Sequence, residues 1–238
     1  MSNEARMPIL EHLHEMRRRM VIAAIAVLVG AIIGFVFRDR LLDLIVEPYE
    51  RATGQSGLAF FEVGEAFSVS MKIALFGGVI LAAPVWLYEI WAFVTPALSK
   101  REKRWVIPII ITLVILFVAG VGFAYWTMER ALDWLLDFGG DRLTPVIGVN
   151  RYLNFAFRYL LVFGVAFLFP VFVFAAGAVG AVSSRQLRKG RRWAVLIIVT
   201  IGAIVTPTGD PLTLILLSTP LYLLYEITIW LVRFLLKK

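Results

Sequence analysis

The chain has 238 residues, of which 60% are hydrophobic and only 17% are charged, and its formal net charge is +7. A soluble domain is roughly half apolar and about a quarter charged, so this composition excludes an ordinary water-soluble protein. The absence of cysteine excludes disulfides, thiolate nucleophiles and cysteine metal sites. We assign the positive charge to loops on the cytoplasmic side of a membrane rather than to nucleic-acid binding.

Apolar runs along the chain predict six transmembrane helices. A helix needs about 20 apolar residues to cross the hydrocarbon core, and backbone polar groups in lipid must be satisfied within the helix. The predicted spans cover about 21–37, 69–91, 106–126, 152–179, 193–206 and 212–231. We therefore expect an all-α integral membrane protein with a single domain, 1–238. No small-residue cleavage site follows the first run, so that run should remain as an anchor.

Basic residues predict the orientation. Sixteen of the 24 Lys and Arg residues fall in one set of loops and ends, and eleven of the 17 acidic residues fall on the opposite side. The basic side is expected to be cytoplasmic. Six spans then place both termini in the cytoplasm of a cell whose plasma membrane holds the chain.

Three segments have the pattern of amphipathic helices that lie along the membrane interface. They are an N-terminal one around Leu13, one around Leu41 and Ile45, and one with an acidic stripe from Glu129 to Asp137. The last two spans look like a short hairpin, because the apolar part of the fifth measures only about 20 Å. Alternatively, the fifth helix extends back through the basic residues that precede it.

Four charged residues stand out, and each has a plain structural interpretation. Glu15 is placed to pair with Arg19 four residues later. Glu102 matches the S-x-x-E capping box, and Asp210 before a proline is typical of a helix N-cap. Lys72 is expected to extend to the outer interface. A carboxylate fixed beside the membrane, such as Glu102, can also receive a cationic ligand.

The sequence contains no pattern typical of an enzyme. It has no nucleophile–base set, no phosphate-binding glycine loop and no cluster of metal ligands. Its two histidines are two positions apart, which puts them on different faces of a helix. We therefore expect no catalysis, no cofactor and no metal. Glu89 and Glu226, near the inner ends of their helices, are interpreted as interface anchors or as proton-linked sites, and we favour anchors.

Four stretches resemble the TatC family, the polytopic receptor subunit of the twin-arginine protein translocase. They are HLHEMRRR at 12–19, AAPVWLYEIWAFVTPALSKREKR at 82–104, FGVAFLFP at 163–170, and TPTGD at 206–210 together with PLYLLYEI at 220–227. The second stretch is the most specific. All four occur in the order that is typical of the family and together extend over nearly the whole chain.

The resemblance implies a function and its residues. Members bind the twin-arginine signal peptides of folded export substrates at the cytoplasmic face and assemble the export complex. Carboxylates receive the two arginines, and the matching positions here are Glu15 and Glu102. Further positions of the recognition surface match Arg17, Phe93 and Pro96. Other positions tied to function match Pro48, Lys72 and Asp210.

The resemblance also implies partners, and two residues depart from the family pattern. The expected partners are single-span subunits of the TatA/TatB type, the lipid bilayer and further copies of the chain. Members have Glu or Gln in the fourth span where this chain has Leu168, and Gln in the sixth where it has Leu214. Those polar groups are associated with docking the single-span partners, so the substitutions concern docking rather than the cytoplasmic receptor site.

Two other functions remain open from the residues alone. A small ion-coupled secondary transporter would carry an ionisable residue at mid-membrane and broken helices there. In this chain charge lies mainly at the ends of the spans, which argues against a carrier. A membrane scaffold without a ligand is the third possibility, and binding of a twin-arginine peptide would exclude it.

Overall fold

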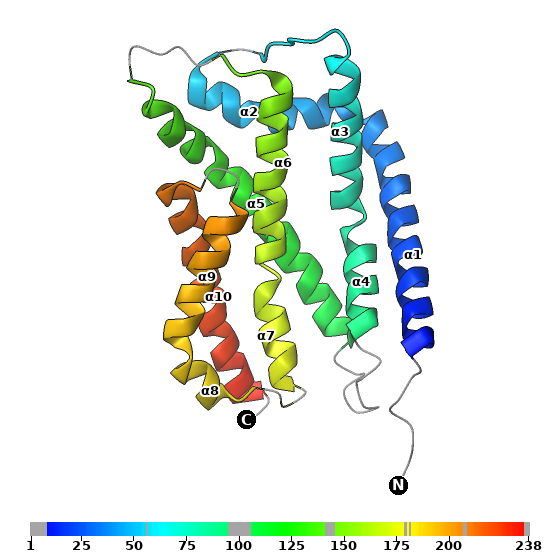
Figure 1. Ribbon diagram of the computed structural model, residues 1–238, viewed down its shortest axis with the longest axis vertical. Helices are drawn as coiled ribbons and strands as arrows, with labels where there is room; N and C mark the ends of the chain where they lie inside the picture. Colours follow the sequence, from blue (N-terminus) through cyan, green and yellow to red (C-terminus); the bar gives the residue numbers. More distant parts are fainter. Residues whose placement is uncertain are drawn as a thin grey trace. The chain divides into compact units, whose positions relative to one another are not determined.

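A computed structural model describes residues 9–55, 57–94, 106–140, 146–178, 180, 182–206 and 209–235, and these are almost entirely helical (Figure 1). The chain divides into two compact units, one of Met1–Leu42 with Ala66–Val114 and the other of Asp43–Glu65 with Ile115–Lys238. The described helices are α1 Ile9–Val36, α2 Arg38–Thr53, α3 Glu65–Leu81, α4 Ala83–Val94, α5 Val106–Asp137, α6 Val149–Ala166, α7 Phe169–Ala178, α8 Ser184–Lys189, α9 Arg191–Val205 and α10 Pro211–Leu235.

The first predicted span and the N-terminal amphipathic segment form one continuous helix, α1, of 28 residues. The sequence pattern predicts two separate elements here. No proline or glycine lies between Ile9 and Gly30, so nothing ends the helix between its polar and apolar parts. The charged residues around Glu15 therefore occupy the first turns of the same rod that carries the apolar span.

The second predicted span, 69–91, is broken into α3 and α4, which meet at an angle of 57°. The break falls at Ala82, two residues before Pro84 (Figure 1). A proline has no N–H to donate and its ring clashes with the carbonyl four residues earlier, so an α-helix ends or kinks there. The amides of Val85 and Trp86 both donate to the Ala82 carbonyl and start the new helix.

Helices α1 and α3 of the first unit approach each other closely at glycines. A Cβ atom placed on Gly78 would lie 2.5 Å from the backbone nitrogen of Ala31 and 2.6 Å from the Val27 carbonyl oxygen. A Cβ atom on Gly30 would lie 2.7 Å from the Gly78 carbonyl oxygen. Small residues at such crossings let two membrane helices pack backbone against backbone.

In the second unit, α2 carries Pro48 inside the helix, and a tyrosine compensates for the missing hydrogen bond. Pro48 cannot donate to the carbonyl of Leu44, four residues earlier. The hydroxyl of Tyr125 on α5 lies 3.0 Å from that carbonyl oxygen and 2.8 Å from Glu47 Oε2. The predicted helix around Leu41 and Ile45 is thus confirmed, and Tyr125 joins its Leu44 carbonyl and Glu47 side chain to α5.

The fourth predicted span, 152–179, is likewise divided, into α6 and α7. The break lies at Phe167 and Leu168, just before Pro170. On α6, Tyr152, Tyr159 and Phe163 are fully buried, as are Phe117 and Met128 on α5. The aromatic core of the second unit therefore lies between α5 and α6. The acidic stripe predicted as a separate helix forms the last turns of α5, which runs on to Asp137.

The final helices differ from the predicted short hairpin in one respect. Helix α9 has 15 residues, which gives about 22 Å and is less than the hydrocarbon core of about 30 Å. Helix α10 has 25 residues, which gives about 37 Å, so it is not short. Of the basic residues before the predicted span, Arg191 and Arg192 begin α9, whereas the others form a separate helix, α8, which is capped by Ser183 and ends at Gly190.

Several described helices are long and apolar enough to cross a membrane. Four stretches qualify, one of which joins α6 and α7, and the bent pair of α3 and α4 qualifies as a fifth span; the four stretches are Leu13–Val36, Ile107–Asp137, Val149–Ala178 and Pro211–Phe234. The chain is a multi-pass helical membrane protein by this measure. The short α9 is not among the qualifying helices.

Candidate functional site

The polar end of α1 holds an arginine between two carboxylates. The guanidinium of Arg19 donates from Nε and Nη2 to Glu15 Oε1, at 3.0 and 2.6 Å, and from Nη1 to Glu89 Oε2 at 3.0 Å. The side chains of Arg19, Glu15 and Glu89 are 24%, 23% and 10% exposed. We call these three residues the arginine triad. It belongs wholly to the first unit, in which α4 packs against α1.

Local geometry explains one half of the triad and the fold explains the other. Glu15 and Arg19 are four residues apart on one helix, so they share a face, as predicted. Glu89 is 70 positions from Arg19 and reaches it from α4. The interpretation of Glu89 as an interface anchor missed this contact, because no spacing in the sequence reports which helix α4 packs against.

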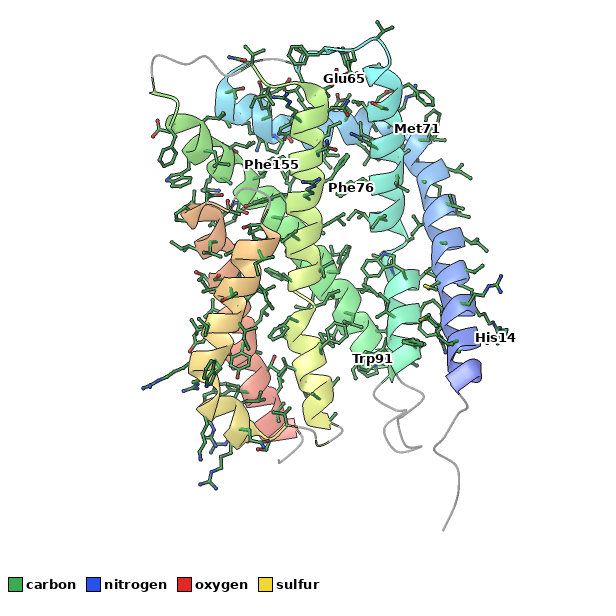
Figure 2. The ribbon with its side chains drawn as sticks, viewed as in Figure 1. His14, Glu65, Met71, Phe76, Trp91 and Phe155 are labelled. Atoms are coloured by element: carbon green, nitrogen blue, oxygen red, sulfur yellow. The ribbon has the colours of Figure 1, made fainter. Side chains whose placement is uncertain are left out.

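The other predicted residues of the inner face are only partly described. Arg17 lies on the exposed side of α1, and Phe93 is half-buried in the last turn of α4. Figure 2 shows His14 on the outer side of α1 and Trp91 on α4. Pro96 and Glu102 lie outside the described residues, as does the capping box proposed for Glu102. Among the predicted binding residues, the structure therefore locates Glu15, Arg17 and Phe93.

Two of the predicted outer residues are held by the fold. Pro48 is buried within α2, where Tyr125 takes up the carbonyl that it leaves unpaired. Lys72 is half-buried on α3. Glu65, which no sequence pattern singled out, is 5% exposed at the start of α3 (Figure 2) and accepts from the amides of Phe61 and Asn150.

Asp210 forms the helix cap that its sequence context predicts. Its Oδ1 accepts a hydrogen bond of 2.8 Å from the backbone nitrogen of Thr213, at the start of α10. Asp210 is 8% exposed and Thr213 is fully buried. The side chain thus satisfies one of the amide groups that a helix start leaves without an intrahelical partner.

We expect Asp210→Asn to keep the stability of the chain and Asp210→Ala to lose about 1 kcal/mol of unfolding free energy, because asparagine caps as well as aspartate and alanine does not cap. Thermal unfolding of both variants in detergent measures this. A loss of transport in Asp210→Asn with unchanged stability would contradict a purely capping role and indicate that the charge itself acts.

Leu168 is buried, and Leu214 packs against a neighbouring helix. Leu168 is 4% exposed at the break between α6 and α7. A Cβ atom on Gly202 of α9 would lie 2.9 Å from Leu214 Cδ1, so this leucine packs closely on α9. A cavity of about 360 Å³ lies between α6, α7, α9 and α10, and side chains such as Val165, Ile201 and Leu217 line it.

The chain is similar to known proteins of the TatC family. The family model described as Sec-independent protein translocase protein (TatC) matches residues 11–220. A TatC protein of Frankia casuarinae is 37% identical, over 95% of this chain and 65% of its own length. One of Carboxydothermus hydrogenoformans is 36% identical over 96% and 93%, and one of Aquifex aeolicus is 37% identical over 94% of each. This chain thus spans under two thirds of the Frankia protein.

Two solved structures share the fold. One, described as the twin-arginine translocase receptor TatC, has a TM-score of 0.78 at 35% identity, over 95% of this chain and 100% of its own. The other, of the same receptor in the detergent DDM, has a TM-score of 0.79 at 36% identity, over 92% and 98%. The four sequence stretches, the helical membrane fold and these matches agree, and the chain belongs to the TatC family of Sec-independent protein translocase proteins.

Proposed function

We propose that this chain is the receptor subunit of a twin-arginine translocase, which binds the signal peptides of folded proteins at the cytoplasmic face of the membrane. One observation carries the proposal: Glu15 is partly exposed at the polar end of α1 and already binds a guanidinium group, that of Arg19. The family supports it, because solved relatives are described as twin-arginine translocase receptors.

The proposed recognition follows from the shape of the guanidinium group. Its donors form a planar fork that fits a carboxylate with two parallel bonds, which an ammonium group cannot reproduce. Two arginines of an extended peptide need two acceptors. We assign these to Glu15 and Glu102, with Arg17, Phe93 and Pro96 on the surrounding surface. We assign no contact with the peptide to Pro48, Lys72 and Asp210, of which Asp210 caps α10.

We further propose a single domain of six spans, with both termini in the cytoplasm and the chain in the plasma membrane. The excess of basic residues in one set of loops supports this orientation. Counting α9 as a sixth span requires the bilayer to thin at that helix, because about 22 Å does not cross a core of about 30 Å. This local thinning would lie beside the cavity between α6, α7, α9 and α10.

Partner subunits follow from size and from the apolar docking region. A chain of 238 residues is too small to enclose a folded passenger, so we propose assembly with single-span partners and with further copies. With Leu168 and Leu214 in place of polar residues, docking here would depend on close packing rather than on hydrogen bonds. Transport energy would come from the membrane potential, because the sequence contains no nucleotide site.

Peptide binding to the detergent-purified protein tests the proposed function. The probe is a labelled twin-arginine signal peptide, and the matched control replaces both arginines by lysine. We expect at least tenfold tighter binding of the arginine peptide, since lysine loses the bidentate contacts. Equal affinity for the two peptides, or no binding by folded protein, would contradict the receptor function.

The broken spans give the carrier hypothesis one of its two expected features. Transporters place ionisable residues at such breaks. Here no Asp, Glu, Lys, Arg or His lies between Lys72 and Glu89, around the first break, or between Arg158 and Arg185, around the second. The breaks therefore lack the charged groups that coupling to an ion requires. Solute uptake by vesicles containing only this protein would revive the carrier hypothesis.

A further inference from the structure

The arginine triad occupies the carboxylate that the proposed function assigns to the signal peptide. Arg19 directs two of its donors to Glu15 Oε1 and a third to Glu89 Oε2. Both contacts are of the kind that a substrate arginine would make. A signal-peptide arginine can therefore reach Glu15 only by replacing Arg19 or by sharing the carboxylate with it.

The charge of the triad leaves room for one more guanidinium group. Two carboxylates and one arginine carry a net charge of −1, so a second arginine would bring the group to neutrality. Each guanidinium would then have one carboxylate as its own partner. Glu89 suits the role of partner to Arg19, since at 10% exposure it is less accessible than Glu15 at 23%. Glu15 is the carboxylate that an incoming peptide meets first.

We propose that Arg19 is an internal competitor for the signal peptide, and that Glu89 is a positioning residue that holds Arg19 when the peptide takes Glu15. The inference rests on the proposed function and adds a regulation to its site. In the absence of peptide, Arg19 donates hydrogen bonds to Glu15. On binding, a substrate arginine displaces it from Glu15, and Arg19 keeps its bond to Glu89. Cations without the fork geometry of arginine compete poorly with Arg19, which sharpens selectivity.

The bend between α3 and α4 explains why Glu89 can hold Arg19. Pro84 breaks the span and turns α4 by 57°, and α4 packs against α1. Glu15 and Arg19 lie on the face of α1 that meets Glu89, while Arg17 and Arg18 on the same helix are exposed. The bend thus places Glu89 beside Arg19, the arginine that also pairs with Glu15.

Two variants that differ in charge separate competition from general electrostatics. Glu89→Gln removes the alternative partner of Arg19, so Arg19 should stay on Glu15, and the twin-arginine peptide should bind about three- to tenfold more weakly. The double variant Arg19→Gln/Glu89→Gln keeps the charge of −1 of the triad but leaves Glu15 without its competitor. It should bind the peptide about three- to tenfold more tightly than the unchanged chain.

The matched control is a pair with the same change of charge elsewhere. Arg191 donates to Glu226 at 2.7 Å in the second unit, and Arg191→Gln/Glu226→Gln should leave the affinity unchanged. If a folded double variant of the triad binds the peptide no more tightly than the unchanged chain, then Arg19 only joins α1 to α4. That result would overturn the inference. If the double variant does not fold, Arg19→Lys replaces it: tighter binding of the arginine peptide supports competition, and equal or weaker binding refutes it.

Failure of the proposed function itself would give a different result. The unchanged chain would then bind the twin-arginine and twin-lysine peptides alike, whatever the triad variants do. If the unchanged chain prefers the arginine peptide and the triad variants do not alter its affinity in the stated directions, the receptor function stands and only the competition by Arg19 is wrong.

Discussion

Replacing both Glu15 and Glu102 by glutamine should abolish export of a twin-arginine substrate, while the chain still inserts into the membrane. Hydrogen bonds to charged groups contribute about 1.5–3 kcal/mol each. Loss of two such contacts amounts to at most about 3–6 kcal/mol, which is two to four decades in affinity. Solvent screening lowers this figure for Glu15, which is 23% exposed. Export of a reporter in cells that lack their own receptor subunit measures the loss.

The control for this experiment is a carboxylate that is engaged elsewhere. Glu226 accepts from Arg191 and from the Tyr222 hydroxyl in the second unit, so Glu226→Gln removes a partly buried acid and changes no residue of the arginine triad. We expect export to continue in this variant. Full export by the Glu15→Gln/Glu102→Gln chain, at a normal level of inserted protein, would refute the assignment of these glutamates to the signal peptide.

The single variant Glu15→Gln should lose peptide binding but keep its fold, because of the contacts within the arginine triad. Glu15→Gln leaves Arg19 bonded to Glu89, so the fold of the first unit should survive. A loss of binding in that variant is therefore attributable to the missing acceptor and not to a loss of packing between α1 and α4. This separation makes Glu15 the more informative of the two positions, and the same binding assay quantifies it.

Sequence patterns predicted where the helices lie better than they predicted where the helices break or which helices pack together. Long apolar runs identified every described span, because burial in lipid demands apolar residues all round a helix. The breaks at Ala82 and at Phe167 were missed, although Pro84 and Pro170 follow them within three residues. Proline occurs inside membrane helices as well, as Pro220 does in α10, so its presence alone does not locate a break.

The candidate site shows the same division between local and long-range information. The pairing of Glu15 with Arg19 and the capping by Asp210 depend on residues within four positions of each other, and the structure has both. The contact of Glu89 with Arg19 and that of Tyr125 with the Leu44 carbonyl join helices far apart in the chain. No periodicity reports such pairs, since they are fixed by which helices pack together.

Gly78→Ala should destabilise the first unit by about 2–3 kcal/mol, at the upper end of what overpacking costs. The added Cβ would lie 2.5 Å from the Ala31 nitrogen and 2.6 Å from the Val27 carbonyl oxygen. Both are backbone atoms of α1, so no side chain can turn away to make room, and α1 and α3 must separate. Thermal unfolding in detergent should show a clear drop in the midpoint.

Gly122→Ala is the matched control, because Gly122 lies on α5 and a Cβ there would meet nothing within 4 Å. That variant should be at least as stable as the unchanged chain, by up to about 1 kcal/mol, because alanine favours a helix over glycine. The separation caused by Gly78→Ala should also weaken binding of the twin-arginine peptide: α4 continues from α3, so moving α3 from α1 draws Glu89 away from Arg19. Equal stability of the two variants would contradict the close backbone approach of α1 and α3. A destabilised Gly78→Ala chain with unchanged peptide affinity would instead show that Glu15 binds its ligand without help from α4.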